Sequence, residues 1–259
     1  MSDFSRARAW VVVTGAASGI GKAVALRLLS DGYLVLALDR HAEGLEELQD
    51  ASQEQNERLS TFVADLADPA VGDDTAARLQ AEEGRLFAHQ ERPCLMGIVN
   101  VAGISTGNSI DKITDEDWEL SMAVNATGPM RLIRALQPFL STDPGASIVN
   151  IASPVAIVGA RKVSYSASKG ALLGLNAALT QNLSPQGIRV NAILPGPTIT
   201  AMTRDWSDEK RAMIASGSPL NRLCRPEDIA GPVSFLLSQD AAYITGTVLN
   251  VTGGSVMGV

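Results

Sequence analysis

The chain has 259 residues, 46% hydrophobic and 19% charged, a globular composition that excludes disordered, collagen-like and coiled-coil architectures. A formal net charge of −7 argues against a nucleic-acid partner, and no apolar run reaches the ~18 residues that would indicate a membrane span. Two histidines and two cysteines without a Cys/His cluster predict no metal site, and reduced thiols with a polar N-terminus predict a cytoplasmic location.

Short apolar segments alternate with longer helical patterns along the chain. Segments rich in Val, Ile and Leu are predicted as strands over 10–13, 33–38, 60–64, 96–101, 147–152, 189–194 and 247–251. Helical patterns cover about 20–31, 42–58, 69–90, 115–140, 164–184 and 226–238. This alternation predicts an α/β fold, a doubly wound Rossmann-type parallel sheet of seven strands with helices on both faces, in a single domain.

Two segments interrupt the alternation. Residues 82–93 are polar and mixed, which predicts a helix end or a surface loop. Residues 200–224 follow the sixth strand, where open α/β sheets place ligand lids, so we expect a substrate lid there; a surface insertion is the alternative. Four apolar residues of this segment fit a helix that packs on a hydrophobic ligand: Met202, Trp206, Met213 and Ile214.

A glycine-rich turn, Thr-Gly-Ala-Ala-Ser-Gly-Ile-Gly at 14–21, joins the first strand to the first helix. Its glycines allow the backbone to approach a ligand, and free N–H groups at a helix N-terminus suit a pyrophosphate. The spacing misses a P-loop, because Ala16 and Ala23 stand where a glycine and a magnesium-binding Ser or Thr are needed. The turn predicts a dinucleotide site that includes Gly15, Ser18, Gly19, Ile20 and Gly21.

Asp39 ends the second predicted strand, eighteen residues after Gly21. In a dinucleotide fold an acidic residue there accepts hydrogen bonds from the adenosine ribose, although a plain turn residue is the alternative. Its carboxylate would repel the 2′-phosphate of NADP, whereas the neighbouring Arg40 could reach toward one. We expect NAD as the cofactor, with NADP less favoured.

Tyr165 and Lys169 are four residues apart at the start of a predicted helix and therefore share one face. A unit charge at ~4 Å and an effective dielectric constant near 20 contributes about 4 kcal/mol, or roughly three pKa units. Such an ammonium would lower the pKa of the phenol toward neutrality, where a general acid/base works best. The alternative is an ordinary pair of helix residues.

Two further polar residues, one after a strand and one within a helix, are candidates for the site. Ser153 follows the fifth strand, whose carboxyl end faces the ligand site, and its alternative role is a cap. Asn125 lies within a predicted helix among apolar neighbours, where its amide is either a structural bridge or part of a water relay. Val155, Ile157 and Val158 suggest an apolar wall beside Ser153.

Together these residues resemble the short-chain dehydrogenase/reductase family over nearly the whole chain, from Thr14 to Gly254. The resemblance rests on five motifs: the glycine turn, Asn-x-Ala-Gly at 100–103, Tyr-x-x-x-Lys at 165–169, Pro-Gly at 195–196 and Pro-Glu-Asp-Ile-Ala at 226–230. It departs from the family pattern in the gap between Ser153 and Tyr165, which is twelve residues where thirteen is common, and in Pro154, which follows Ser153; both changes would reshape the wall of the substrate pocket.

The resemblance implies roles for individual residues. Tyr165 would be the catalytic acid/base, Lys169 its partner and a ribose ligand, Ser153 a donor to the substrate oxygen and Asn125 the holder of a relay water. Further cofactor contacts would come from Asp39, Arg40, Asp65, Leu66, Asn100, Ala102, Gly103, Pro195, Gly196, Thr198 and Thr200. The family also implies the strand order 3-2-1-4-5-6-7 and a homotetramer formed by the helices at about 115–140 and 164–184.

The expected function is that of an NAD-dependent oxidoreductase, which transfers a hydride between the nicotinamide and a secondary alcohol or ketone. Its partners would be a small-molecule substrate and copies of itself, without nucleic acid or membrane. Two alternatives stay open: an NADPH-dependent 3-oxoacyl-thioester reductase and a non-catalytic NAD-binding regulator.

Overall fold

The computed structural model describes residues 9–86, 94–143, 145–200 and 203–256. Within them, seven parallel strands form one sheet in the order β3-β2-β1-β4-β5-β6-β7. The strands are β1 (Trp10–Thr14), β2 (Leu34–Asp39), β3 (Leu59–Val63), β4 (Leu95–Asn100), β5 (Ser147–Ile151), β6 (Arg189–Pro195) and β7 (Val248–Val251). All seven predicted strands and their order are confirmed.

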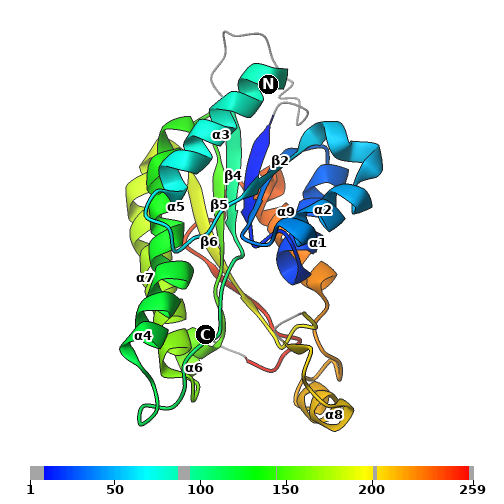
Figure 1. Cartoon of the computed structure of the whole chain (residues 1–259), viewed down its shortest axis with the longest axis vertical. Coiled ribbons are helices and arrows are strands. Elements are labelled where there is room, and N and C mark those ends of the chain that lie inside the picture. The colour runs from blue at the N-terminus through cyan, green and yellow to red at the C-terminus, as the bar shows by residue number, and fades with distance from the viewer. Residues whose placement is uncertain (1–8, 87–93, 144, 201–202, 257–259) are drawn as a thin grey trace.

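Six helices cover the two faces of this sheet (Figure 1). One face carries α1 (Gly19–Ser30), α2 (Ala42–Ala51) and α9 (Pro226–Leu237), and the other carries α3 (Val71–Leu86), α5 (Gly128–Leu136) and α7 (Val163–Leu183). The other α-helices among the described residues are α4 (Asp115–Met122), α6 (Val155–Val158) and α8 (Asp208–Ser216). The predicted Rossmann-type fold with helices on both faces is therefore confirmed.

The strand residues alternate between two cores because successive side chains of a strand point to opposite faces. In β1, Val11 and Val13 join the core beneath α1 and α9, whereas Trp10 and Val12 join the core beneath α3 and α5. All five residues of this strand are buried, as expected of a strand covered on both faces.

Two predicted helices are broken into shorter elements. The helix expected over 42–58 ends at Ala51 and continues as the 3₁₀ turn η2 (Gln53–Arg58). The helix expected over 115–140 consists of α4, the π-helical turn η3 (Ala123–Thr127), α5 and the 3₁₀ turn η4 (Gln137–Phe139). Hydrophobic periodicity does not distinguish these tighter or wider turns from an α-helix.

The polar segment 82–93 is only partly a surface feature. Glu82 and Glu83 belong to α3 and are buried, and the indole of Trp10 donates a hydrogen bond of 2.6 Å to the Glu83 carboxylate. Glu82 pairs with Arg78 and Arg85 at 2.7 and 2.8 Å. This cluster lies at the amino end of β1, away from the predicted site, and residues 87–93 lie outside the described residues. None of the described helices has the length and apolarity that a membrane span requires.

Candidate active site

A cavity of about 870 Å³ lies at the carboxyl ends of the strands. Its walls come from the segments that follow β1 to β7 and from the first half of α7. In Figure 1 this edge of the sheet is the lower one, with α6 on one side and α8 on the other. The topology therefore gathers loops from all seven strands around one volume, as the sequence predicts for a ligand site.

The glycine turn has no room for side chains at three of its positions. A Cβ on Gly21 would lie 2.0 Å from the carbonyl oxygen of Gly15, one on Gly15 would lie 2.8 Å from the backbone of Ala102, and one on Gly19 would lie 2.9 Å from Cγ2 of Thr200. Gly15 and Gly19 also adopt φ angles of +70° and +53°, which side chains disfavour. The turn thus presents bare backbone and the N-terminus of α1 to the cavity, an arrangement that suits a pyrophosphate.

Thr14 fixes the glycine turn against the neighbouring strand. Its hydroxyl accepts hydrogen bonds of 3.1 Å from the backbone N–H groups of Val101 and Ala102, just after β4. Sequence reasoning missed this role, because only the tertiary structure brings residues 87 and 88 positions apart into contact. The bond holds two walls of the cavity at a fixed separation.

Asp39 is held in place at the end of β2. Its two carboxylate oxygens accept hydrogen bonds of 3.0 Å from the backbone N–H groups of Ala17 and His41. Arg40 and His41 lie beside it on the cavity wall, as do Asp65 and Leu66 after β3. The carboxylate therefore lies at the predicted ribose end, on the side of the glycine turn.

Tyr165 and Ser153 face each other across the cavity wall. Burial raises the pKa of the Tyr165 phenol above its usual value of 10, and a hydrogen bond with the Ser153 hydroxyl acts in the opposite direction. The predicted lowering of this pKa toward neutrality is therefore wrong in this structure. The physical reason is desolvation, which disfavours the charged phenolate more than its hydrogen bond favours it.

Lys169 lies one helical turn after Tyr165 and lines the same cavity, although it is almost completely buried. Its ammonium donates a hydrogen bond of 2.8 Å to the carbonyl oxygen of Ile151 at the end of β5. Burial lowers its pKa to about 8. This amine is thus positioned by β5 as well as by its own helix.

Asn125 acts as a structural bridge, one of the two roles expected of it. Its amide exchanges two hydrogen bonds of 2.8 and 2.9 Å with the backbone of Ile104 and donates a third, of 2.9 Å, to Ser168. The side chain lies in the π-helical turn η3 and ties the segment after β4 to α7. It does not line the cavity, so the relay role stays a prediction.

Asn100 is not on the cavity wall, contrary to the prediction. It is buried at the end of β4, where its side-chain amide donates a hydrogen bond of 2.8 Å to Asn150. The amide of Asn150 in turn donates a hydrogen bond of 3.0 Å to Asn176. Side chains alternate along β4, so Asn100 shares the sheet face of Ile98, which belongs to the core beneath α5 and α7, and the cavity wall begins at the next residue, Val101.

The other predicted site residues do meet at the cavity. They share a position in the loops at the carboxyl edge of the sheet or at the start of α1 and α7, and they are Gly15, Ser18, Gly19, Ile20, Gly21, Asp39, Arg40, Asp65, Leu66, Ala102, Gly103, Ser153, Tyr165, Lys169, Pro195, Gly196, Thr198 and Thr200. The prediction omitted the wall residues Ser105, Lys162, Thr203 and Lys210, because no motif marks them.

The segment after β6 is anchored at its base and forms part of the wall. Thr198 and Cys224 pair as a parallel bridge, with hydrogen bonds of 3.0 Å from Ile199 to Cys224 and 2.9 Å from Cys224 to Pro197. Of the apolar residues expected to contact a ligand, Trp206 lines the cavity.

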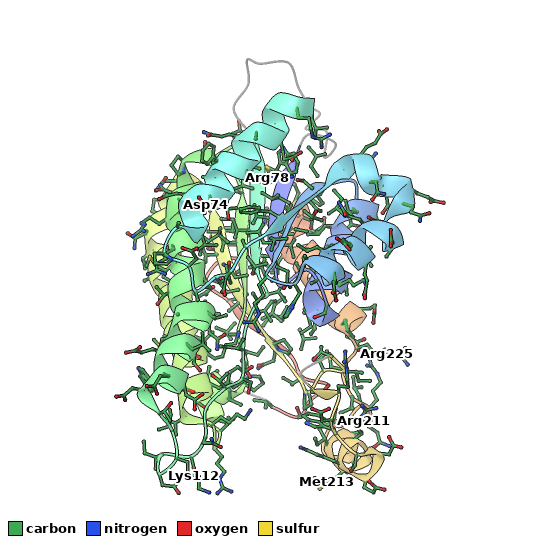
Figure 2. All side chains as sticks on the ribbon, viewed as in Figure 1. Asp74, Arg78, Lys112, Arg211, Met213 and Arg225 are labelled. Atoms are coloured by element: carbon green, nitrogen blue, oxygen red, sulfur yellow. The ribbon has the colours of Figure 1, made fainter. Side chains whose placement is uncertain are left out.

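The other apolar residues that we expected to contact a ligand mostly lie away from the main cavity. Met213 is 66% exposed on α8 and is labelled at the edge of the molecule in Figure 2. Ile214 lines a separate cavity of about 300 Å³, and Met202 lies outside the described residues. Val155 lines the main cavity, but Ile157 and Val158 are exposed, which contradicts the predicted apolar wall of three residues.

These features fit a dinucleotide. The turn before α1 offers backbone where a Cβ would clash, Asp39 offers a carboxylate beside that turn, and Tyr165 and Lys169 occupy the same cavity. Fold and site together define a dinucleotide-binding α/β protein with a tyrosine and a lysine beside the binding cleft.

Comparisons with known proteins agree with this class. Residues 15–255 match a family model described as enoyl-(acyl carrier protein) reductase. The chain is 34% identical over 258 residues to 2,3-dihydro-2,3-dihydroxybenzoate dehydrogenase of Bacillus subtilis, with 95% of each chain covered.

Solved structures agree as well. A short-chain dehydrogenase/reductase from Brucella melitensis, described as glucose/ribitol dehydrogenase, superposes with a TM-score of 0.86 at 32% identity, covering 97% of this chain and 98% of the other. The angucycline C-6 ketoreductase LanV with bound NADP gives a TM-score of 0.87 at 29% identity, covering 96% of both chains. The chain belongs to the short-chain dehydrogenase/reductase family and is an oxidoreductase of that family.

Proposed function

We propose that this oxidoreductase uses NAD to interconvert a secondary alcohol and a ketone. The observation that carries the proposal is the shared cavity: Tyr165, Ser153 and Lys169 line the same volume as the glycine turn. A nicotinamide dinucleotide bound there supplies a hydride acceptor or donor. The protein's own residues then have to orient the substrate and move one proton.

Tyr165 and Ser153 perform the proton chemistry in this proposal. In the oxidation, the ionised Tyr165 oxygen takes the hydroxyl proton of the substrate as hydride leaves its carbon. In the reduction, the neutral phenol donates that proton, and the Ser153 hydroxyl donates a hydrogen bond to the carbonyl oxygen. The raised pKa of Tyr165 keeps the phenol protonated near neutral pH, which suits the reduction.

Lys169 supports Tyr165 from the next turn of α7. With a pKa of about 8, its amine is mostly charged at neutral pH, and a positive charge on this side favours ionisation of the phenol in the reaction. A ribose hydroxyl is the second partner that we assign to it, because the amine has three donors and Ile151 takes one.

Asp39 supports NAD over NADP. Its carboxylate is fixed by two backbone N–H groups, so it cannot swing away from a 2′-phosphate without losing both hydrogen bonds. The neighbouring structure LanV holds NADP, and Arg40 also lines the cavity, so the preference requires a direct measurement. The thioester reductase that uses NADPH is the weaker candidate for the same reason.

Further parts of the proposal concern the assembly and the lid. We assign residues 200–224 to a substrate lid, because Thr203, Trp206 and Lys210 line the cavity.

A homotetramer formed through α4, α5 and α7 is supported by Trp118 and Leu120 of α4, which are 42% and 41% exposed. A cytoplasmic location is supported by the cysteine content, because two cysteines are too few for a disulfide framework.

The test is NADH-linked absorbance at 340 nm across a library of alcohols and ketones, with NAD⁺ and NADP⁺ in parallel. We expect turnover of a secondary alcohol with NAD⁺ and the reverse reaction with NADH. Light scattering in solution reports the tetramer. Binding of NADH by calorimetry without turnover of any compound would favour the non-catalytic regulator.

A further inference from the structure

Charged side chains are unevenly distributed along the main cavity. Among the described residues, the carboxylates on its wall are Asp39 and Asp65, which follow β2 and β3 and have Arg40 beside Asp39. The wall formed by the start of α7 and by the segment before and within α8 carries Lys162 and Lys210 instead. The part of the cavity around Tyr165 is therefore cationic.

Lys162 lies at the N-cap of α7, three residues and about one helical turn before Tyr165. Its ammonium donates a hydrogen bond of 2.6 Å to the carbonyl oxygen of Ser105 and lies 3.3 Å from the hydroxyl of that residue. Ser105 also lines the cavity. Since an ammonium has three donors, Lys162 is held in position and keeps a donor for a ligand.

Lys210 approaches from the opposite element. It lies in the first turn of α8, and its ammonium is 5.0 Å from the centre of the Trp206 ring, a distance that gives a cation–π attraction. Trp206 and Lys210 both line the cavity. The indole thus restricts the lysine to this wall.

No carboxylate neutralises either lysine in the part of the chain that the structure describes. The ion pairs found there involve Lys22, Arg27, Arg78, Arg85 and Arg222 as the cations. The acidic residue next to Lys210, Glu209, is engaged with the start of its own helix, where hydrogen bonds to backbone and Ser207 lower its pKa. Both ammoniums are available to an anion.

We propose that the substrate carries an anionic group, a carboxylate or a phosphate, which Lys162 and Lys210 bind while the reacting carbon lies at Tyr165. This inference rests on the proposed function, since it names the substrate class of the same site. A neutral alcohol would leave two ammoniums facing the cavity without a counter-ion. An anion that contacts both lysines would also hold α8 toward α7.

The experiment compares matched probes with the full-length enzyme. Hydroxy acids are paired with their methyl esters, and phosphorylated alcohols with the parent alcohols, in assays with NAD⁺ at 340 nm. We expect at least one anion to exceed its neutral partner about tenfold in kcat/KM, the effect of one charge-assisted hydrogen bond. The two series show whether a carboxylate or a phosphate is preferred.

Lys162→Gln and Lys210→Gln should each reduce this preference several-fold, mainly by raising KM for the anionic probes, and should affect the neutral partners less than the anions. Lys162→Arg and Lys210→Arg should restore part of it. Lys112→Gln is the matched control, because this substitution removes the same charge. Lys112 is exposed in the turn that precedes α4 and does not line the cavity (Figure 2). The affinity for NADH should stay the same in all variants.

The failures of the two proposals differ. Turnover of neutral compounds alone, with no effect of either lysine variant, would overturn the inference and leave the oxidoreductase proposal intact. A loss of NADH affinity without any change in the preference for anions would assign the lysines to the cofactor and would also overturn it.

If no compound is turned over, saturation-transfer NMR with the enzyme–NADH complex measures binding of the same probes. Weaker binding of anions to Lys162→Gln or Lys210→Gln would then support the anion site even as the catalytic proposal fails. Equal binding of anionic and neutral probes to all variants would contradict it.

Discussion

The ammonium of Lys169 and the carbonyl oxygen of Ile151 are 2.8 Å apart and form a buried hydrogen bond between α7 and the end of β5. This contact places the amine beside the cavity without a carboxylate partner, so its positive charge is poorly solvated. The chain then continues from Ile151 to Ser153, whose hydroxyl forms a hydrogen bond with the Tyr165 phenol. One strand end therefore positions both groups that act on the phenol.

Tyr165→Phe should abolish turnover while preserving the fold. The variant removes only the phenolic oxygen, and general acid/base catalysis contributes about 10²- to 10⁴-fold. We expect kcat to fall by about 10³-fold with an unchanged melting temperature and an unchanged Kd for NADH. Tyr243→Phe is the control, because Tyr243 is fully exposed. Wild-type rates in Tyr165→Phe would refute the catalytic assignment.

The pH profile of the wild-type enzyme should differ between the two directions. Because burial raises the pKa of Tyr165, the phenol is protonated at neutral pH and must ionise before it can accept a proton. Alcohol oxidation should therefore become faster as the pH rises from 6 to 10, and ketone reduction should become slower at the alkaline end. Initial rates in both directions, at saturating cofactor, test this. A flat profile for oxidation would mean that another group takes the proton.

Lys169→Met should stabilise the protein near neutral pH. The folded-state pKa is lowered from 10.5 to about 8, so the charged form costs stability in the folded state. That cost is absent above the unfolded-state pKa, grows as the pH falls from 10.5 to 8 and is constant below 8. The free energy of unfolding of the variant, relative to wild type, should rise by about 2 to 3 kcal/mol between pH 10 and pH 7.

Urea denaturation of wild type, Lys169→Met and Lys112→Met at both pH values measures this difference. The lost hydrogen bond to Ile151 lowers the stability of Lys169→Met by a similar amount at each pH, so the pH-dependent part isolates the charge. Lys112→Met should show almost no pH-dependent difference from wild type. A Lys169→Met difference that shrinks as the pH falls would show that the ammonium is stabilised in the folded protein.

Asp39→Ala should shift cofactor preference toward NADP. The substitution removes the carboxylate that we place at the ribose, and with it the repulsion of a 2′-phosphate. The ratio of kcat/KM for NADP⁺ to that for NAD⁺ should rise at least about tenfold. Asp50→Ala is the control, since Asp50 is exposed on α2 and does not line the cavity. A wild-type enzyme that already prefers NADP⁺ would contradict the proposed role of Asp39.

Gly21→Ala and Gly84→Ala should have opposite effects. A Cβ on Gly21 would lie 2.0 Å from the Gly15 carbonyl oxygen, so the variant should lose NADH binding and about 3 kcal/mol or more of stability. Gly84 is an exposed residue of α3 with open space around it, and alanine there should stabilise the helix by up to about 1 kcal/mol. Thermal unfolding and NADH titration of both variants provide the comparison.

The sequence alone determined the sheet and the sides of the cavity. Strand segments rich in Val, Ile and Leu, separated by helical periodicity, predict a parallel sheet, because only a sheet covered on both faces buries such strands completely. The glycine turn, Asp39, Ser153, Tyr165 and Lys169 could be predicted as well, since each follows a strand or begins a helix at the same edge of the sheet.

Only the tertiary structure decided the electrostatics and the non-motif residues. The direction of the Tyr165 pKa depends on burial by distant segments, which spacing along a helix does not report. Asn100 and Asn125 form hydrogen bonds within the core. The sequence did not show these bonds, because the partners, Asn150 and Ser168, are far along the chain from Asn100 and Asn125. Lys162 and Lys210 likewise line one cavity only in the folded chain. They belong to different elements, and nothing in the sequence shows that these elements border the same cavity.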